Sequence, residues 1–154
     1  MIPYGQQDIT EEDIAAVTAV LRSSYITQGP LVPQFERELC EYTGANHCVV
    51  ANSATSCLHI ACSALGLSEN DILWTSPITF VASANCALYC GATVDFVDIE
   101  PESFNICPVE LKRKLEQAAK VNKLPKILIA VHMAGQSPNM EEIFKLSQEY
   151  NFYI

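Results

Sequence analysis

Short apolar runs suited to β-strands alternate with helix-like segments along most of this chain, and that alternation is what most limits its fold. The strand-like runs are residues 47–51, 72–75, 93–97, 127–131 and 152–154. Helix-like segments lie between most of them. Such segments are long enough to serve as the crossover connections that consecutive parallel strands need. The pattern predicts an α/β fold of three layers around a mostly parallel sheet, with ligands at the carboxyl ends of the strands.

Capping residues and glycines mark the ends of the predicted helices. Thr10, with Asp13 three residues later, is typical of a helix start, and Gly44 closes a second helix that begins near Val32. Further helices are predicted at 54–65, closed by Gly66, at about 80–90, from Pro108 onward and at 140–150. The segment 54–65 is apolar on nearly every face, so we expect that helix to be buried under its neighbours.

Charge and cysteine usage exclude several classes of protein. The 154 residues carry 9 basic and 18 acidic side chains, a net charge of −9, which opposes binding to nucleic acid or anionic membranes. No basic and apolar leader precedes Pro3 and no apolar run is long enough to span a bilayer, so we expect a cytoplasmic protein without a membrane partner. The seven cysteines form no C-x-x-C pair and the three histidines no ligand spacing, so we predict reduced core thiols and no metal.

Two turns carry residues suited to binding chemistry. At 52–56 a strand-like run gives way to small hydroxyl residues before a helix, where free amides and the helix dipole favour an anion, although simple helix capping explains the same residues. The spacing matches neither a P-loop nor the G-x-G-x-x-G fingerprint. At 75–80, Pro77 fixes a turn that brings Phe80 to the same edge of the sheet; from spacing alone, Phe80 as a core residue is the simpler interpretation.

Four segments resemble one protein family in order and spacing. They are "YITQGP", "NSATSCLHIACSALGL", "WTSPITFVASANCALYCGATVDFVDIEPESFNI" and "VHMAGQSPNM". The chain resembles the DegT/DnrJ/EryC1/StrS family of pyridoxal-phosphate-dependent sugar aminotransferases essentially from Met1 to Ile154. Within the family it is most similar to the branch that acts on a UDP-linked 4-keto-6-deoxy-N-acetyl sugar in pseudaminic acid biosynthesis.

The resemblance implies a cofactor site at the two turns. The amides of Ala54 and Thr55, with the Thr55 hydroxyl, would hold the phosphate of pyridoxal 5'-phosphate, and Phe80 would stack on its pyridine ring. Gln136, in "HMAGQ", would lie near the ring hydroxyl.

The resemblance also implies a substrate site near the amino terminus. Tyr4 and the run Ile26, Thr27, Gln28 and Gly29 would line a sugar-nucleotide pocket at a homodimer interface. For each of these five residues an ordinary surface turn is the alternative.

The resemblance further implies that residues 1–154 are the amino-terminal part of a longer, single cofactor-binding large domain with the fold of aspartate aminotransferase (fold type I). In relatives the strand beginning here as "NFYI" continues into Glu-Asp-Ala-Ser-His, whose aspartate pairs with the pyridinium nitrogen, and the lysine that binds the cofactor covalently comes much later. We expect this chain to stop before both and to be inactive alone. The following lysines are predicted to be solvated charges instead: Lys112, Lys114, Lys120, Lys123, Lys126 and Lys145.

The expected activity belongs to the full-length protein. It would transfer an amino group, with glutamate as the expected donor, to C4 of the UDP-linked keto sugar. Two alternatives stay open: a sugar dehydratase of the same family, in which another residue replaces the lysine, and a non-catalytic module that binds phosphate or a nucleotide sugar.

Overall fold

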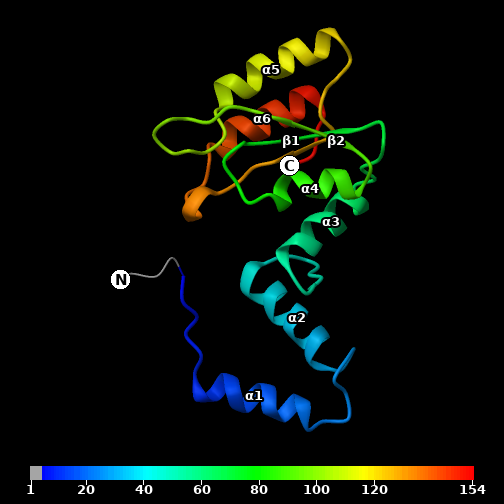
Figure 1. The fold of residues 1–154 in the computed structure, drawn as a ribbon, viewed down its shortest axis with the longest axis vertical. Helices are drawn as coiled ribbons and strands as arrows, with labels where there is room; N and C mark the ends of the chain where they lie inside the picture. The colour runs from blue at the N-terminus through cyan, green and yellow to red at the C-terminus, as the bar shows by residue number, and fades with distance from the viewer. Residues whose placement is uncertain (1–4) are drawn as a thin grey trace. The chain divides into compact units, whose positions relative to one another are not determined.

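The computed structural model describes residues 5–154 and divides the chain into two compact units. One unit ends at Val50, and the other comprises Ala51–Ile154 (Figure 1). In the described part of the chain, no helix combines the length and the apolar character that crossing a bilayer requires.

The first unit consists of two helices whose ends follow the predicted signals. Helix α1 (Glu11–Leu21) begins with a capping box, in which Asp13 N donates to Thr10 Oγ1 at 3.3 Å and Thr10 N donates to Asp13 Oδ2 at 2.8 Å. Helix α2 (Leu31–Thr43) ends at Gly44, whose left-handed φ of 75° is easily reached without a side chain. Neither helix buries a residue, so both present apolar side chains to solvent.

The second unit contains a parallel three-stranded sheet in the order β2-β1-β3. The strands are β1 (Ile72–Thr75), β2 (Thr93–Phe96) and β3 (Ile127–Ile129), and Trp74 of β1 lies opposite Asp95 of β2 and Leu128 of β3. Tyr153 adds a parallel bridge to Ile127 on the outer side of β3. The predicted parallel strands at 72–75, 93–97 and 127–131 are therefore confirmed, the last two in slightly shorter form.

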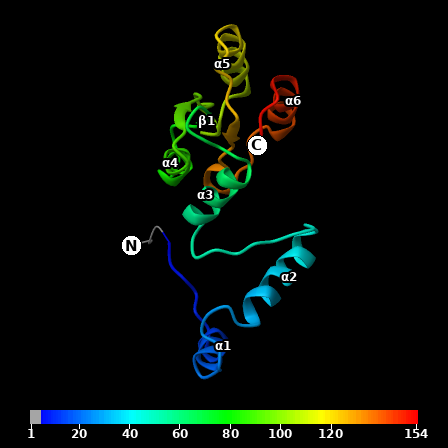
Figure 2. The same ribbon diagram turned by 90° about the vertical axis from the view of Figure 1, so that its right-hand side faces the viewer.

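Helices cover both faces of this sheet and make three layers (Figures 1 and 2). On one face lie α3 (Ala54–Ala64) and α4 (Ala82–Tyr89), and on the other α5 (Pro108–Lys120) and α6 (Met140–Tyr150). Successive strand residues point to opposite faces: Leu73 belongs to the core under α3 and α4, and Trp74 to the core under α5 and α6. The predicted three-layer α/β architecture is confirmed for residues 51–154.

Two predictions about this region are wrong. Residues 47–51 form no strand, and Val49 is 72% exposed, because an apolar run becomes a strand only beside a hydrogen-bonding neighbour and within residues 5–154 none is paired with it. Helix α3 is not buried under neighbours either. Only Cys62 of α3 is buried, and Ile60 is 49% exposed, because the described elements cover a single side of the helix.

A polar cluster stabilises the end of the sheet at which the parallel strands begin, called here its amino edge; the opposite end is the carboxyl edge. Lys126, which directly precedes β3, donates from Nζ to Gly66 O at 2.6 Å and to Asp71 Oδ2 at 2.8 Å. The same carboxylate accepts hydrogen bonds from Ser68 N at 2.9 Å and Ser68 Oγ at 3.0 Å. The hydrogen bond from Lys126 lowers the pKa of Asp71 and outweighs the opposing effect of burial. The cluster therefore joins the α3–β1 turn to β3.

We expect Asp71→Asn to lower the free energy of unfolding by about 1 kcal/mol at neutral pH. Because the folded-state pKa of Asp71 lies below its ordinary value of 3.8, the stabilisation is complete above about pH 4 and is lost as the pH falls through the folded-state value. Urea unfolding between pH 7 and pH 3 measures both effects. Glu141→Gln, which alters the exposed Lys145 pair, is the control and should cost less. Equal costs for the two variants at pH 7 would contradict this assignment.

Candidate functional site

Helix α3 begins at the carboxyl edge of the sheet. Its far end is at the amino edge, because the Lys126 hydrogen bond holds Gly66, two residues after the helix, beside the start of β3. Leu58 and Ala61 of α3 share a groove of about 270 Å³ with β3, so the helix lies along that strand. Because the helix lies along β3 with its last turn at the amino edge, its first turn lies toward the carboxyl end of that strand. The first turn of α3 therefore lies where α/β proteins bind ligands.

The first turn of α3 leaves two backbone amides free. Ser53 is the N-cap: its Oγ accepts from Ser56 N at 3.2 Å, and Ser56 Oγ donates to Asn52 Oδ1 at 2.7 Å. Within residues 5–154, the N–H groups of Ala54 and Thr55 and the Thr55 hydroxyl make no hydrogen bond. Since this turn also carries no acidic residue, its positive dipole end is not neutralised. The geometry suits an anion.

Phe80 lies in the connection from β1 to α4 with its ring largely outside the core. The residues just before it are fixed: Thr75 and Ser76 are fully buried, and Thr75 Oγ1 donates to Ile129 O at 3.2 Å. Phe80 itself is 74% exposed, so it is not a core residue in this structure. Its ring is available to stack on a planar ligand.

Gln136 leaves the same edge of the sheet after β3. Residues 130–132 and a 3-10 turn, η1 (Met133–Gly135), separate it from the strand, and Gln136 N donates to Met133 O at 3.0 Å. The turn holds Ala134 at a left-handed φ of 51°, a conformation that costs about 1 kcal/mol for a residue with a side chain. The side chain of Gln136 is exposed.

Asn105 is a residue of this edge that the sequence does not reveal. It is 1% exposed, its Oδ1 accepts from Met133 N at 3.0 Å, and its Nδ2 donates to Gln136 O at 3.0 Å. The only signal is one amide residue in the run "SFNI" ahead of a buried isoleucine, and the partners lie 28 and 31 residues away.

The predicted cofactor residues thus come from three connections at the carboxyl edge. Ala54 and Thr55 open α3, while Phe80 and Gln136 follow the neighbouring strands β1 and β3. Their convergence into one cleft stays a prediction.

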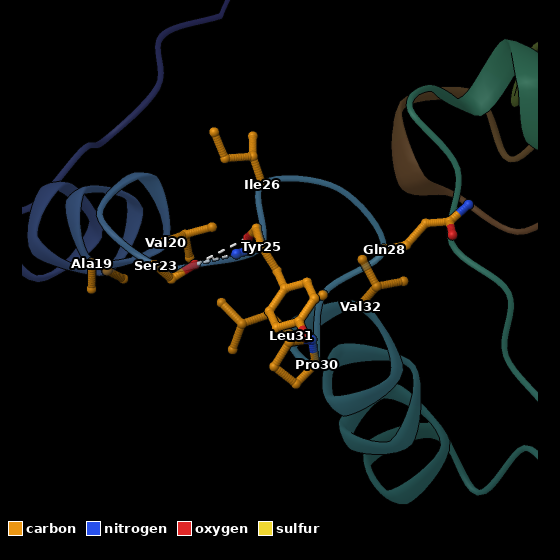
Figure 3. A pocket seen from close by; sticks show the side chains of 11 residues that line it. Ala19, Val20, Ser23, Tyr25, Ile26, Gln28, Pro30, Leu31 and Val32 are labelled. Carbon is orange, nitrogen blue, oxygen red and sulfur yellow. Dashed lines mark hydrogen bonds between the residues drawn. The ribbon is translucent and has the colours of Figure 1, made fainter.

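In the first unit, three of the predicted substrate residues line an apolar groove of about 410 Å³ (Figure 3). Ile26, Gln28 and Gly29 contribute to it, together with residues of α1 and the start of α2, whereas Thr27 is not among its lining residues. A side chain at position 29 would clash with its neighbour, because a Cβ there would lie 2.9 Å from Tyr25 Cβ. This explains why a glycine stands at position 29. Tyr4 lies outside the described residues.

The thiols and imidazoles of residues 5–154 form no group that could hold a metal ion. None of the seven cysteines forms a disulfide; Cys62 and Cys86 are buried as expected of core residues, whereas Cys57 is exposed. Burial raises the pKa of Cys62 to about 12, which makes that thiol unreactive.

The geometry of the α3 cap generates a stability prediction. We expect Ser53→Ala to lower the free energy of unfolding by about 1 kcal/mol, because Ser56 N loses its acceptor. Ser53→Thr should recover most of the loss, and Thr55→Val should leave stability nearly unchanged. Denaturant unfolding of the three variants measures the differences. A neutral Ser53→Ala beside a destabilising Thr55→Val would show that Thr55 is the cap instead.

Comparison with known proteins identifies the family. The family model described as the DegT/DnrJ/EryC1/StrS aminotransferase family matches residues 7–154. A Campylobacter jejuni relative, UDP-4-amino-4,6-dideoxy-N-acetyl-beta-L-altrosamine transaminase, is 42% identical over 98% of this chain and 39% of its own length.

Solved structures of sugar aminotransferases share the fold. The Helicobacter pylori aminotransferase PseC, involved in the biosynthesis of pseudoaminic acid, is 33% identical with a TM-score of 0.84, over 98% of this chain and 40% of its own. The PLP-form of a putative sugar aminotransferase from Streptococcus pneumoniae is 29% identical with a TM-score of 0.86, over 99% of this chain and 38% of its own. The chain spans about two-fifths of the length of these proteins, has the fold of type I pyridoxal-phosphate aminotransferases, and belongs to the DegT/DnrJ/EryC1/StrS aminotransferase family.

Proposed function

We propose that the full-length protein is a pyridoxal-phosphate-dependent aminotransferase whose acceptor is a UDP-linked 4-keto-6-deoxy-N-acetyl-hexose. The observation that carries the proposal is the pair of free amides, Ala54 N and Thr55 N, at the start of α3. They offer a phosphate group two donors and the positive end of a helix dipole, with no carboxylate nearby in the first turn to repel it. The residues therefore fit the cofactor that the family uses.

Each residue of the edge has a role toward that cofactor. When bound, pyridoxal phosphate would supply an aldehyde carbon that carries the amino group and a ring that accepts electrons. The N–H groups of Ala54 and Thr55, with the Thr55 hydroxyl, would bind the phosphate. The exposed ring of Phe80 would orient the pyridine ring and keep water from one face. The side-chain amide of Gln136 would lie near the ring hydroxyl.

The sugar and the amino donor are proposed from the relatives. The Campylobacter jejuni relative is named for a UDP-linked altrosamine, which supports a UDP-sugar as the acceptor here. We assign the sugar nucleotide to the stretch Ile26, Thr27, Gln28 and Gly29, together with Tyr4, and we take glutamate as the donor. A cytoplasmic homodimer is part of the same proposal.

The lysine that binds the cofactor covalently is assigned to positions of the relatives that this chain does not span. Three of the lysines here are held in ion pairs: Lys114 with Asp95 at 2.7 Å, Lys126 with Asp71 at 2.8 Å, and Lys145 with two glutamates of α6. Lys112, Lys120 and Lys123 are exposed. On this proposal residues 1–154 alone are inactive.

The activity is tested by incubating the full-length protein with pyridoxal phosphate, glutamate and the UDP-linked 4-keto sugar. The 4-amino sugar and 2-oxoglutarate, formed in equal amounts, are the expected products. A deoxygenated sugar without amino transfer would identify a dehydratase. Tight binding of the nucleotide sugar without any product would identify a binding module. Either of these two results would overturn the proposed reaction.

Thr55→Val tests the phosphate site. The variant keeps both amides and the dipole but loses one hydrogen bond to a charged group, worth about 1.5 to 3 kcal/mol, so cofactor affinity should fall roughly tenfold to hundredfold. Titration of pyridoxal phosphate into the full-length protein measures the loss. Ser63→Ala, near the other end of α3, is the matched control and should leave affinity unchanged. Equal affinity in wild type and Thr55→Val would remove Thr55 from the site.

A further inference from the structure

We infer that Asn105 is a positioning residue for Gln136: its buried side chain holds the β3–α6 connection in the one backbone conformation that presents the Gln136 side chain to the cofactor. The inference rests on the proposed function, since it assigns a purpose to a conformation of the cofactor edge. Asn105 itself is 1% exposed and acts through Gln136.

The backbone of Asn105 is fixed by hydrogen bonds within its own connection. It lies in the β2–α5 connection, which folds back on itself through an antiparallel bridge between Ile99 and Ile106. Its backbone oxygen accepts from Glu100 N at 2.8 Å, and its backbone nitrogen donates to Ser103 Oγ at 3.2 Å. Since both backbone groups have partners, the Asn105 side chain extends from a fixed base.

The side chain spans the segment it holds. Oδ1 accepts from Met133 N and Nδ2 donates to Gln136 O, each at 3.0 Å, so one planar amide bonds to both ends of the η1 turn. Gln136 N donates to Met133 O at 3.0 Å. The backbone of Gln136 is therefore fixed at its N–H and at its C=O, while its side chain stays exposed.

The conformation held in this way is one that the turn would not prefer by itself. Ala134 has φ 51° and ψ 28°, a left-handed geometry that is unfavourable for a residue with a Cβ. Such strain persists only where surrounding contacts over-determine it, and it gathers at ligand-binding sites. The two hydrogen bonds from Asn105 are contacts of that kind.

Only an amide serves both partners. Aspartate would accept from Met133 N but would place a buried charge beside Gln136 O, which also needs a donor. Alanine would leave both partners unsatisfied. Asn105→Asp and Asn105→Ala should therefore both release the turn, the first through an unfavourable buried charge and the second through the loss of both hydrogen bonds.

The first test is a double-mutant cycle in the full-length protein, with the dissociation constant of pyridoxal phosphate as the readout. Asn105→Ala should weaken binding about three- to tenfold, the effect of one lost neutral hydrogen bond. In a Gln136→Ala background the same change should weaken it less than about twofold, because the residue through which Asn105 acts is gone. Ser147→Ala is the control: it removes a buried hydroxyl that donates to Phe144 O in α6 and should leave the dissociation constant unchanged.

The second test is hydrogen exchange in the cofactor-free protein. In Asn105→Ala and Asn105→Asp the amide of Gln136 should exchange at least about tenfold faster than in wild type, because the turn that protects it is released. The amide of Leu128, which donates to Tyr153 O in the sheet, should be unaffected. A general loss of stability would speed both amides.

The outcomes separate this inference from the proposed function. Wild type that binds no pyridoxal phosphate would overturn both. Binding in wild type, with Asn105→Ala equally harmful in both backgrounds, would overturn only the role of Asn105. Unchanged exchange at Gln136 in both variants would do the same. Coupling in the cycle together with faster exchange confined to the turn would support the inference.

Discussion

The parallel pairing of β1 with both β2 and β3 sets the position of everything that follows it in the chain. Because parallel strands all end at the same edge, the connections that leave β1 and β3 emerge side by side. The hydrogen bond from Thr75 Oγ1 to Ile129 O fixes the last residues of these two strands to each other. Phe80 and Gln136, separated by more than fifty residues in sequence, owe their common edge to this pairing.

Burial on both faces makes that register hard to shift. Leu73 and Trp74 are adjacent in β1 and point into different cores, so a slip by one residue would exchange a leucine and a tryptophan between them. On the face of the sheet covered by α5, Lys114 Nζ lies 4.8 Å from the centre of the Trp74 ring and forms an ion pair with Asp95 of the edge strand β2. The contact secures β2, which has one neighbour among the described strands, to the helix above it.

The features that the sequence predicts well are those with local causes. The strand at 72–75 and the helix at 140–150 have the predicted limits, and Pro108 and Gly44 mark helix ends because their backbone preferences act within a few residues. The strand predicted at 47–51 is absent from the described structure, since pairing depends on a partner that apolar character alone cannot supply. The burial of α3 and the exposure of Phe80 depend in the same way on neighbours that are distant in sequence.

The candidate site shows the same division. The small residues at 52–56 predict free amides at a helix start, but the choice of Ser53 as cap, which leaves Thr55 available, appears only in the geometry. The role of Asn105 cannot be predicted from the sequence, because its partners Met133 and Gln136 are distant in the chain and no periodic pattern relates them to Asn105.

The unsatisfied first turn of α3 connects the stability of the fold to the binding of an anion. Helix α3 has one buried residue, so it contributes little apolar burial to its own stability. The two amides of its first turn have no partner among residues 5–154, and the dipole end there is not compensated by a carboxylate. A phosphate at this position satisfies the amides and the dipole together. Because a ligand that binds only the folded state stabilises it by mass action, an anion bound at this turn would raise the stability of the folded protein.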